Sequence, residues 1–80
     1  MSVTVVCLGK LADLAGVAER QLDAPLDWQG LLAALGDELA EQVRGDRVRI
    51  ALNGDLISDK PALQAGEGDE IALLPPVSGG

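Results

Sequence analysis

The sequence predicts one α+β domain, in which a β-sheet packs on a single helical region. Three observations lead to this prediction. The chain has 80 residues, enough for one hydrophobic core and too few for a second. Strand-like segments rich in β-branched or alternating apolar residues lie near the start and in the second half. Between them lies one region whose apolar residues recur at helical spacing.

Residues 3–8, VTVVCL, form the first expected strand, because β-branched residues dominate this segment. Both faces of the strand are apolar: Val3, Val5 and Cys7 alternate on one, and Val6 and Leu8 on the other. We assign the first set to the core. A short helical turn that ends at Gly16 should then connect to a second, more polar strand over residues 18–24.

The helical region is expected to begin after Pro25, with Asp27 as its N-cap. Its apolar stripe follows the i, i+3, i+4, i+7 pattern and consists of Trp28, Leu31, Leu32 and Leu35. Gly36 and Asp37 interrupt this stripe. Asp37 is a candidate cap for a second segment, which would end at Gly45. The pattern is compatible with one kinked helix or with two short ones.

The second half of the chain predicts three further strand segments. Residues 47–52 alternate strictly, and Asn53-Gly54 is a strong signal for a two-residue hairpin loop. This loop pairs Leu52 with Asp55, Ala51 with Leu56 and Ile50 with Ile57. A connection anchored by Leu63 leads to the last strand, residues 70–74, with Ile71 and Leu73 inward.

These parities leave an apolar set on the face of the sheet that the helical region cannot cover. Its members are Val6, Leu8, Ala51, Leu56, Ala72 and Leu74. An antiparallel sheet usually has a polar outer face, and an exposed apolar patch usually marks a partner. We therefore interpret this face as a docking surface.

Composition excludes several classes of function. Thirteen acidic against six basic residues give a net charge of −7, which argues against binding to nucleic acid or to an anionic membrane. The chain has no His and one Cys, which excludes Ser-His or Cys-His nucleophile pairs and thiol metal clusters. Cys7 is expected to be a buried structural residue. No signal peptide or spanning segment is apparent, so we expect the cytoplasm.

The ending LLPPVSGG has an unusual chemical character. No charged side chain follows Glu70, two prolines stiffen the backbone, and the last two residues have no side chain. Such a thread can enter a channel that excludes other residues, and it carries one reactive group, the terminal carboxylate. Activation as an adenylate would let a sulfur nucleophile convert that carboxylate to a thiocarboxylate. The chain has no P-loop, so an outside enzyme must supply the ATP site.

Four segments carry a family resemblance: the ending EIALLPPVSGG, the opening VTVVCLGKLADLAG, the central LNGDLI and the turn GEGDEI. Together they resemble the MoaD family, the small sulfur-carrier subunits of molybdopterin synthase, over essentially the whole chain. The resemblance implies the β-grasp fold of ubiquitin-like proteins, a mixed sheet on one helical region. The corresponding division is a β-grasp domain over residues 1–74 and a flexible tail over residues 75–80.

The resemblance also implies roles and partners. Gly80 would be adenylated and converted to a thiocarboxylate, Gly79 would complete the narrow tail, and sulfur would pass to cyclic pyranopterin monophosphate in molybdenum cofactor biosynthesis. The chain would be a non-catalytic subunit that binds no cofactor. Its partners would be a MoaE-like large subunit, in a heterotetramer, and a MoeB-like adenylyltransferase that uses ATP. Docking is expected at Leu8, Leu56, Leu74, Pro75, Pro76 and Val77.

Three alternatives remain open at the level of sequence. The chain could carry sulfur for another pathway, such as thiamin thiazole, cysteine or tRNA thiolation. It could be a ubiquitin-like modifier that forms isopeptide bonds, because that chemistry uses the same activated terminus. It could also be an acidic binding module with an inert tail, which mass spectrometry of the terminus would reveal.

Overall fold

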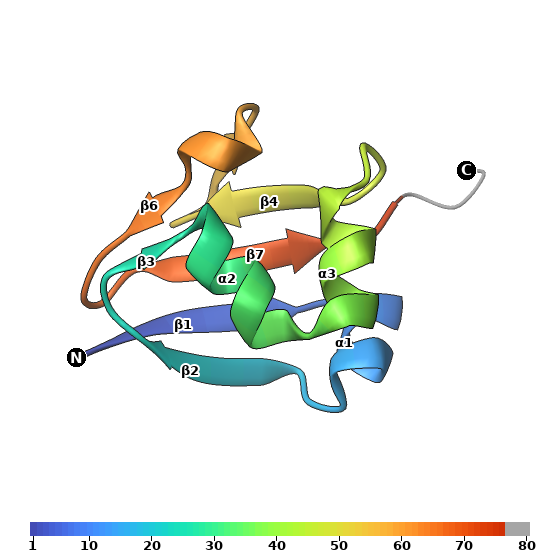
Figure 1. Ribbon diagram of the computed structural model, residues 1–80, viewed down its shortest axis with the longest axis horizontal. Helices are drawn as coiled ribbons and strands as arrows, with labels where there is room; N and C mark the ends of the chain where they lie inside the picture. Colours follow the sequence, from blue (N-terminus) through green and yellow to red (C-terminus); the bar gives the residue numbers. More distant parts are fainter. Residues whose placement is uncertain (77–80) are drawn as a thin grey trace.

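The chain folds as a five-stranded mixed sheet with two helices across one face (Figure 1). The computed structural model describes residues 1–76. Its elements in chain order are β1 (Ser2–Cys7), α1 (Lys10–Ala15), β2 (Glu19–Asp23), β3 (Leu26–Asp27), α2 (Trp28–Leu35), α3 (Asp37–Arg44), β4 (Arg49–Leu52), β5 (Asp55–Ile57), the 3₁₀ turn η1 (Lys60–Ala62), β6 (Gln64–Ala65) and β7 (Glu70–Leu74). None of the helices between residues 1 and 76 is long and apolar enough to cross a membrane.

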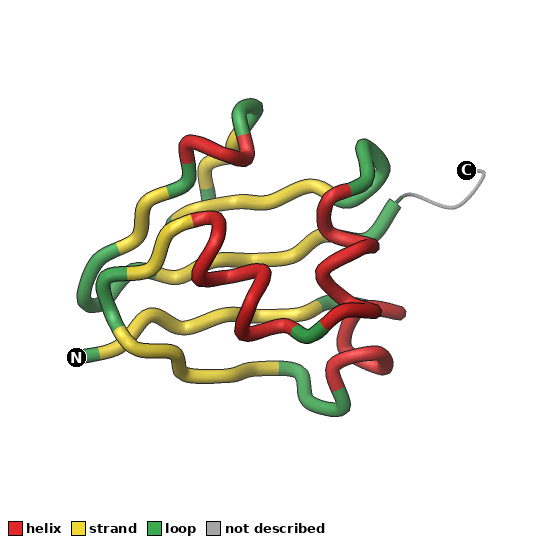
Figure 2. Tube along the Cα trace, in the orientation of Figure 1, coloured by secondary structure: helices red, strands yellow, loops and turns green. Residues whose placement is uncertain are grey.

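The strand order is β2-β1-β7-β4-β5, with β1 and β7 parallel at the centre and the other pairs antiparallel. α2 and α3 lie against the same face of the sheet, and short β3 and β6 pair beside it (Figures 1 and 2). This is the β-grasp arrangement that was expected. Because β1 and β7 run in the same direction, the end of β1 lies next to the end of β7.

The core lies between the sheet and the helices and confirms the predicted parities. The inward residues of β1 and β7, namely Val3, Val5, Cys7, Ile71 and Leu73, are at most 1% exposed. They pack with the predicted helical stripe, Trp28, Leu31, Leu32 and Leu35, all of which are buried. Aliphatic side chains dominate this cluster, as expected for a chain with one aromatic residue.

The helical region consists of two helices rather than one kinked helix. Asp27 caps α2 as predicted, since its Oδ1 accepts a hydrogen bond of 2.8 Å from the amide of Gly30. Gly36 separates the helices with φ 86° and ψ 163°, a conformation that glycine adopts readily. The prediction that Asp37 caps the second helix was wrong. Gly36 occupies the cap position without a side-chain bond, and Asp37 is the first residue of α3.

The β4–β5 hairpin has the register that Asn53-Gly54 predicted. Ile50 pairs with Ile57, Ala51 with Leu56 and Leu52 with Asp55. Both turn residues have positive φ, 52° at Asn53 and 87° at Gly54, as a type I′ turn requires. The outward orientation of Leu56, which depends on this register, is therefore confirmed.

Sequence reasoning missed β3, β6 and η1, which lie in segments that were read as connections. Lys60 of η1 has a structural role that was also missed. Its Nζ donates hydrogen bonds to the carbonyl oxygens of Val43, at 2.8 Å, and Gly45, at 2.7 Å. These carbonyls belong to the end of α3, where a cation interacts favourably with the helix dipole.

Replacing Lys60 with Met is expected to lower the free energy of unfolding by about 1 kcal/mol, because the end of α3 loses two charge-assisted hydrogen bonds at a partly exposed site. Urea denaturation measures this effect. Lys10→Met is the matched control, since Lys10 is exposed. Equal stabilities of the two variants would contradict the capping role.

The turn before β7 is held to the β4–β5 hairpin by two side chains. Asp69 accepts hydrogen bonds from the amide of Gly66 at 2.8 Å and from the side chain of Asn53 at 3.1 Å. Asn53 Oδ1 in turn accepts a bond of 2.9 Å from the amide of Glu70. The bonds from Gly66 and Asn53 favour the ionised form and hold the pKa of Asp69 below its usual value.

This depressed pKa predicts the pH dependence of stability. A carboxyl whose pKa is lower in the folded state stabilises the protein fully above the unfolded pKa of about 3.9, and loses that contribution as pH falls through the folded pKa. We expect the wild type to have a higher free energy of unfolding than Asp69→Asn. The difference between the two should be constant from pH 7 to about pH 5 and should decrease below about pH 4. Urea midpoints across this range test it, and a difference unchanged at about pH 2.5 would contradict it.

Candidate functional site

The outer face of the sheet carries a continuous apolar surface. We define the outer face by the six predicted residues Val6, Leu8, Ala51, Leu56, Ala72 and Leu74. The strand registers place four of them in one row, because Val6 pairs with Ala72, Ala72 with Ala51, and Ala51 with Leu56. The row therefore crosses β1, β7, β4 and β5.

The two largest exposed side chains of this surface lie at its sides. Leu56 is 61% exposed on edge strand β5, and Leu8 is 43% exposed just after β1. Leu74 is half-buried. Ala51 was expected to be exposed on the outer face. It is only 6% exposed, although it does not belong to the core cluster. Its small side chain lies on interior strand β4, between Ala72 of β7 and Leu56 of β5.

The first two residues of the C-terminal tail, Pro75 and Pro76, adjoin this surface at one end of the sheet, and we call them the tail root. β7 ends at Leu74, and Pro75 and Pro76 follow, half-buried and exposed respectively. The amide of Leu8 donates a hydrogen bond of 3.3 Å to the carbonyl of Leu73, which holds Leu8 beside the end of β7. Predicted site residues Val77, Gly79 and Gly80 lie outside the described residues, and of the tail predicted to be flexible, residues 75–80, the structure describes only Pro75 and Pro76.

Exposed basic side chains gather at the same end. Arg49 lies directly opposite Leu74, and Lys10 and Arg47 line a hollow with Pro75 and Pro76. Asp13 and Glu41 line the same hollow, so its charge is mixed. Elsewhere, Arg20 donates a hydrogen bond of 3.0 Å to the carbonyl of Ala34 and has a structural role. The surface around the tail root thus differs in charge from the acidic chain as a whole.

The model of the ThiS family matches residues 5–80, which include the outer face, the tail root and the terminal glycines. The chain belongs to the ThiS family. This is a family of ubiquitin-like sulfur carriers, in agreement with the sulfur chemistry that the tail predicts. Among curated protein sequences, none matches the chain.

Solved structures of similar fold include small archaeal modifier proteins and a subunit of molybdopterin-converting factor. SAMP1 from Haloferax volcanii is 30% identical over the full length of both chains, with a TM-score of 0.73. A chain of the complex of subunits 1 and 2 of molybdopterin-converting factor from Helicobacter pylori is 31% identical, also over both full lengths, with a TM-score of 0.68. The small archaeal modifier protein 1 from Methanosarcina acetivorans is 27% identical, with 99% and 96% coverage and a TM-score of 0.75.

Cys7 of this ThiS-family chain is structural, as expected. The residue is 1% exposed in the core, and burial raises the pKa of its thiol. A neutral buried thiol is a poor nucleophile. In residues 1–76 no three His, Cys, Asp or Glu side chains are grouped to hold a metal ion.

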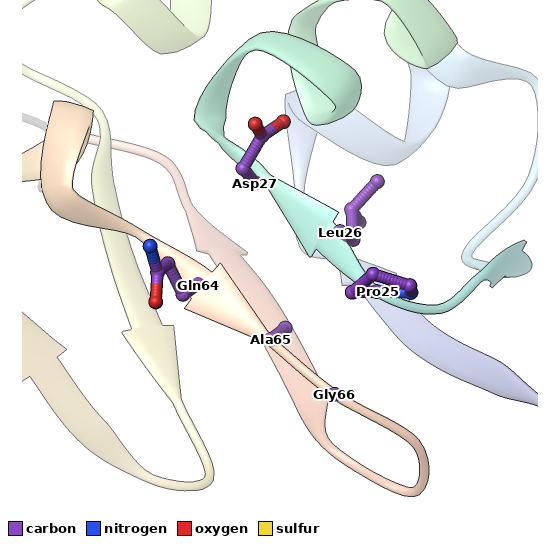
Figure 3. Close-up of a pocket in the computed structure, with 6 residues that line it drawn as sticks. All are labelled: Pro25, Leu26, Asp27, Gln64, Ala65 and Gly66. Carbon is purple, nitrogen blue, oxygen red and sulfur yellow. The ribbon is translucent and has the colours of Figure 1, made fainter.

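A pocket of about 620 Å³ lies where β3 pairs with β6 (Figure 3). It is lined by Pro25, Leu26, Asp27, Gln64, Ala65 and Gly66. β7 ends on the side of the sheet opposite β3 and β6, so the pocket lies apart from the residues that follow β7 (Figure 1). Its carboxylate, Asp27, is already engaged as the cap of α2.

Proposed function

We propose that this chain carries sulfur as the small subunit of a molybdopterin synthase, through a thiocarboxylate at Gly80. The observation that carries the proposal is that the apolar outer face continues into the tail root. Leu8 and Leu74 adjoin at the end of β1 and β7, and Pro75 follows Leu74 directly. A partner that covers this face is therefore in position to receive the tail. The similarity to the Helicobacter pylori complex supports the assignment.

Sulfur is loaded on the terminal carboxylate and transferred from it in three steps. A carboxylate oxygen of Gly80 attacks the α-phosphate of ATP, which forms an acyl-adenylate and releases pyrophosphate. Hydrosulfide, or an equivalent sulfur donor, then attacks the acyl carbon, and AMP leaves. The thiocarboxylate sulfur finally attacks a carbon of cyclic pyranopterin monophosphate, and the oxygen substituent of that carbon leaves. Water then hydrolyses the resulting thioester, which leaves the sulfur on the pterin and restores the Gly80 carboxylate. Two such transfers supply the two dithiolene sulfurs.

Each partner protein has a separate role in this proposal. A ubiquitin-activating-type adenylyltransferase binds ATP and activates Gly80, while the MoaE-like large subunit holds the pterin and provides the catalytic side chains. Two copies of each synthase subunit would form a heterotetramer. Leu8, Leu56 and Leu74 would dock on the large subunit, and Pro75 through Gly80 would enter its active site. The ATP requirement is consistent with a cytoplasmic reaction.

Intact mass spectrometry tests the proposal. The chain is incubated with ATP, sulfide and a candidate adenylyltransferase, and the mass of a terminal thiocarboxylate is expected. The product is then mixed with a large subunit and cyclic pyranopterin monophosphate, and molybdopterin should form. A thiocarboxylate that forms but is not consumed by any large subunit would point to another sulfur pathway, and an unchanged mass would contradict sulfur carriage.

The similarity to SAMP1 favours a second candidate, a ubiquitin-like protein modifier. In this role the adenylated Gly80 would form an isopeptide bond with a lysine amine, and AMP would leave. Incubation with ATP and the activating enzyme in a cell extract without added sulfide separates the two functions. Lysine-linked conjugates of higher mass support the modifier, and a free thiocarboxylate as the main product supports the sulfur carrier.

A further inference from the structure

Gly9 connects β1 to α1 in a conformation that favours glycine. Its φ is 55° and its ψ is −131°, and it occupies the cap position before Lys10. Side chains with a Cβ are strained at such angles. The flanking backbone is bonded on both sides, since the amide of Ala12 donates to the carbonyl of Gly9 at 3.1 Å and the amide of Leu8 donates to Leu73. Gly9 is therefore held firmly beside the end of β7.

Pro75, the first residue after β7, packs on the bare Cα of Gly9. A Cβ added to Gly9 would lie 3.2 Å from Cγ of Pro75 and 3.9 Å from its Cβ. The first distance is closer than an ordinary van der Waals contact. Pro75 is half-buried, whereas the next residue, Pro76, is exposed. The ring of Pro75 thus packs against the folded domain at Gly9. We call this contact the Pro75 seat, and it is possible because residue 9 has no side chain.

The direction of the backbone at Pro75 matters because of the length of chain beyond it. When the tail is extended in a narrow channel of the partner, the six residues from Pro75 to Gly80 would reach roughly 20 Å. Over that distance, a swing of about 10° at the root would displace the tip by about 3.5 Å. An error of about 1 Å at a reacting group can cost on the order of 100-fold in rate.

We propose that Gly9 is a positioning residue for the C-terminal tail: by seating Pro75, it sets the direction in which the tail leaves the sheet toward the partner's active site. This inference rests on the proposed sulfur-carrier function. It assigns a role to a residue that makes no contact with the reacting atoms and acts only through Pro75.

Gly9→Ala tests the seat, with Gly36→Ala as the matched control. Gly36 also has a glycine-type conformation, with φ 86° and ψ 163°, but an added Cβ there would meet no heavy atom within 4 Å. Both variants strain the backbone, and only the first displaces Pro75. We expect Gly9→Ala to slow single-turnover sulfur transfer in the assembled synthase about 10-fold or more, while its affinity for the large subunit stays within about 2-fold. Gly36→Ala should transfer sulfur within about 2-fold of the wild-type rate.

Pro75→Ala completes a double-mutant cycle with Gly9→Ala. Ala lacks the Cγ that the new Cβ would meet, so the double variant Gly9→Ala/Pro75→Ala should transfer sulfur at the rate of Pro75→Ala alone. Such non-additivity is the signature of a direct contact between two residues. Equal rates for Gly9→Ala and Gly36→Ala, or a double variant clearly slower than Pro75→Ala alone, would overturn the proposal.

A measurement on the free wild-type protein does not depend on the variants folding or on sulfur chemistry. Nuclear Overhauser effects should connect the α-protons of Gly9 with the ring γ-protons of Pro75. Their absence overturns the seat. The two proposals also fail in different ways: a wild-type chain that forms no thiocarboxylate contradicts sulfur carriage, whereas wild-type transfer with no specific loss in Gly9→Ala contradicts the seat alone.

Discussion

Deletion of Gly80 is expected to reduce sulfur transfer by at least about 100-fold and to leave docking intact. The new terminal carboxylate, on Gly79, is set back by about 3.5 Å, the length of one extended residue. Misplacing a reacting group by even about 1 Å can cost about 100-fold in rate. The outer face lies within residues 6–74 and is unchanged by the deletion, so the affinity for the large subunit should persist.

Thiocarboxylate formation and affinity for the large subunit are measured separately for this variant. A second variant, with one Ala added after Gly80, controls for length in the other direction. It should also fail, because its carboxylate overshoots the reactive position and a methyl group enters the narrow end of the channel. Near wild-type transfer by either variant would show that the tail is only a tether.

The sheet was predictable from sequence because local signals determine its geometry. Asn53-Gly54 favours a type I′ turn, which sets the pairing of β4 with β5 residue by residue. Once Ile50 is inward, the position of Leu56 on the outer face follows. The same alternation along β1 and β7 separates the buried residues from Val6 and Leu74. The outer face could therefore be predicted before its neighbours in space were known.

The features that were missed depend on contacts between distant parts of the chain. β3 and β6 have two residues each, too few for any periodic pattern, and they form because Leu26 and Ala65 meet in the fold. Lys60 caps α3 from 15 and 17 residues away. Asp37 matched the local preference for a cap, yet Gly36 takes that position because it can adopt positive φ between two helices.

The same distinction between local patterns and contacts of distant residues applies to the candidate site. Alternation predicted its apolar side chains, whereas the terminal glycines are implied only by the family resemblance and lie outside the described residues. The packing of Pro75 on Gly9 has no sequence signal, because a glycine before a short helix is ordinarily read as a simple turn. Burial of Ala51 was missed for a related reason, since parity gives the face of a residue but not the size of its neighbours.

Leu56→Asp is expected to weaken binding to the large subunit by about 30-fold or more without unfolding the domain. Leu56 is 61% exposed, so an aspartate at this position stays hydrated in the free protein. In the complex the same carboxylate would be buried against an apolar surface, and buried hot-spot side chains contribute about 2 kcal/mol or more to binding. Leu74→Asp should also weaken docking, with a larger loss of stability because Leu74 is half-buried.

The control for Leu56→Asp is Ala33→Glu, which adds the same single negative charge on α2. Ala33 is exposed on the helical side of the sheet, so a general charge effect would appear there equally. Calorimetric binding to the large subunit and thermal unfolding of each free variant separate docking from stability. Binding by Leu56→Asp that equals binding by Ala33→Glu would exclude the outer face as the docking surface. Loss of cooperative unfolding in Leu56→Asp would instead show that Leu56 packs inward, against the register that Asn53-Gly54 imposes.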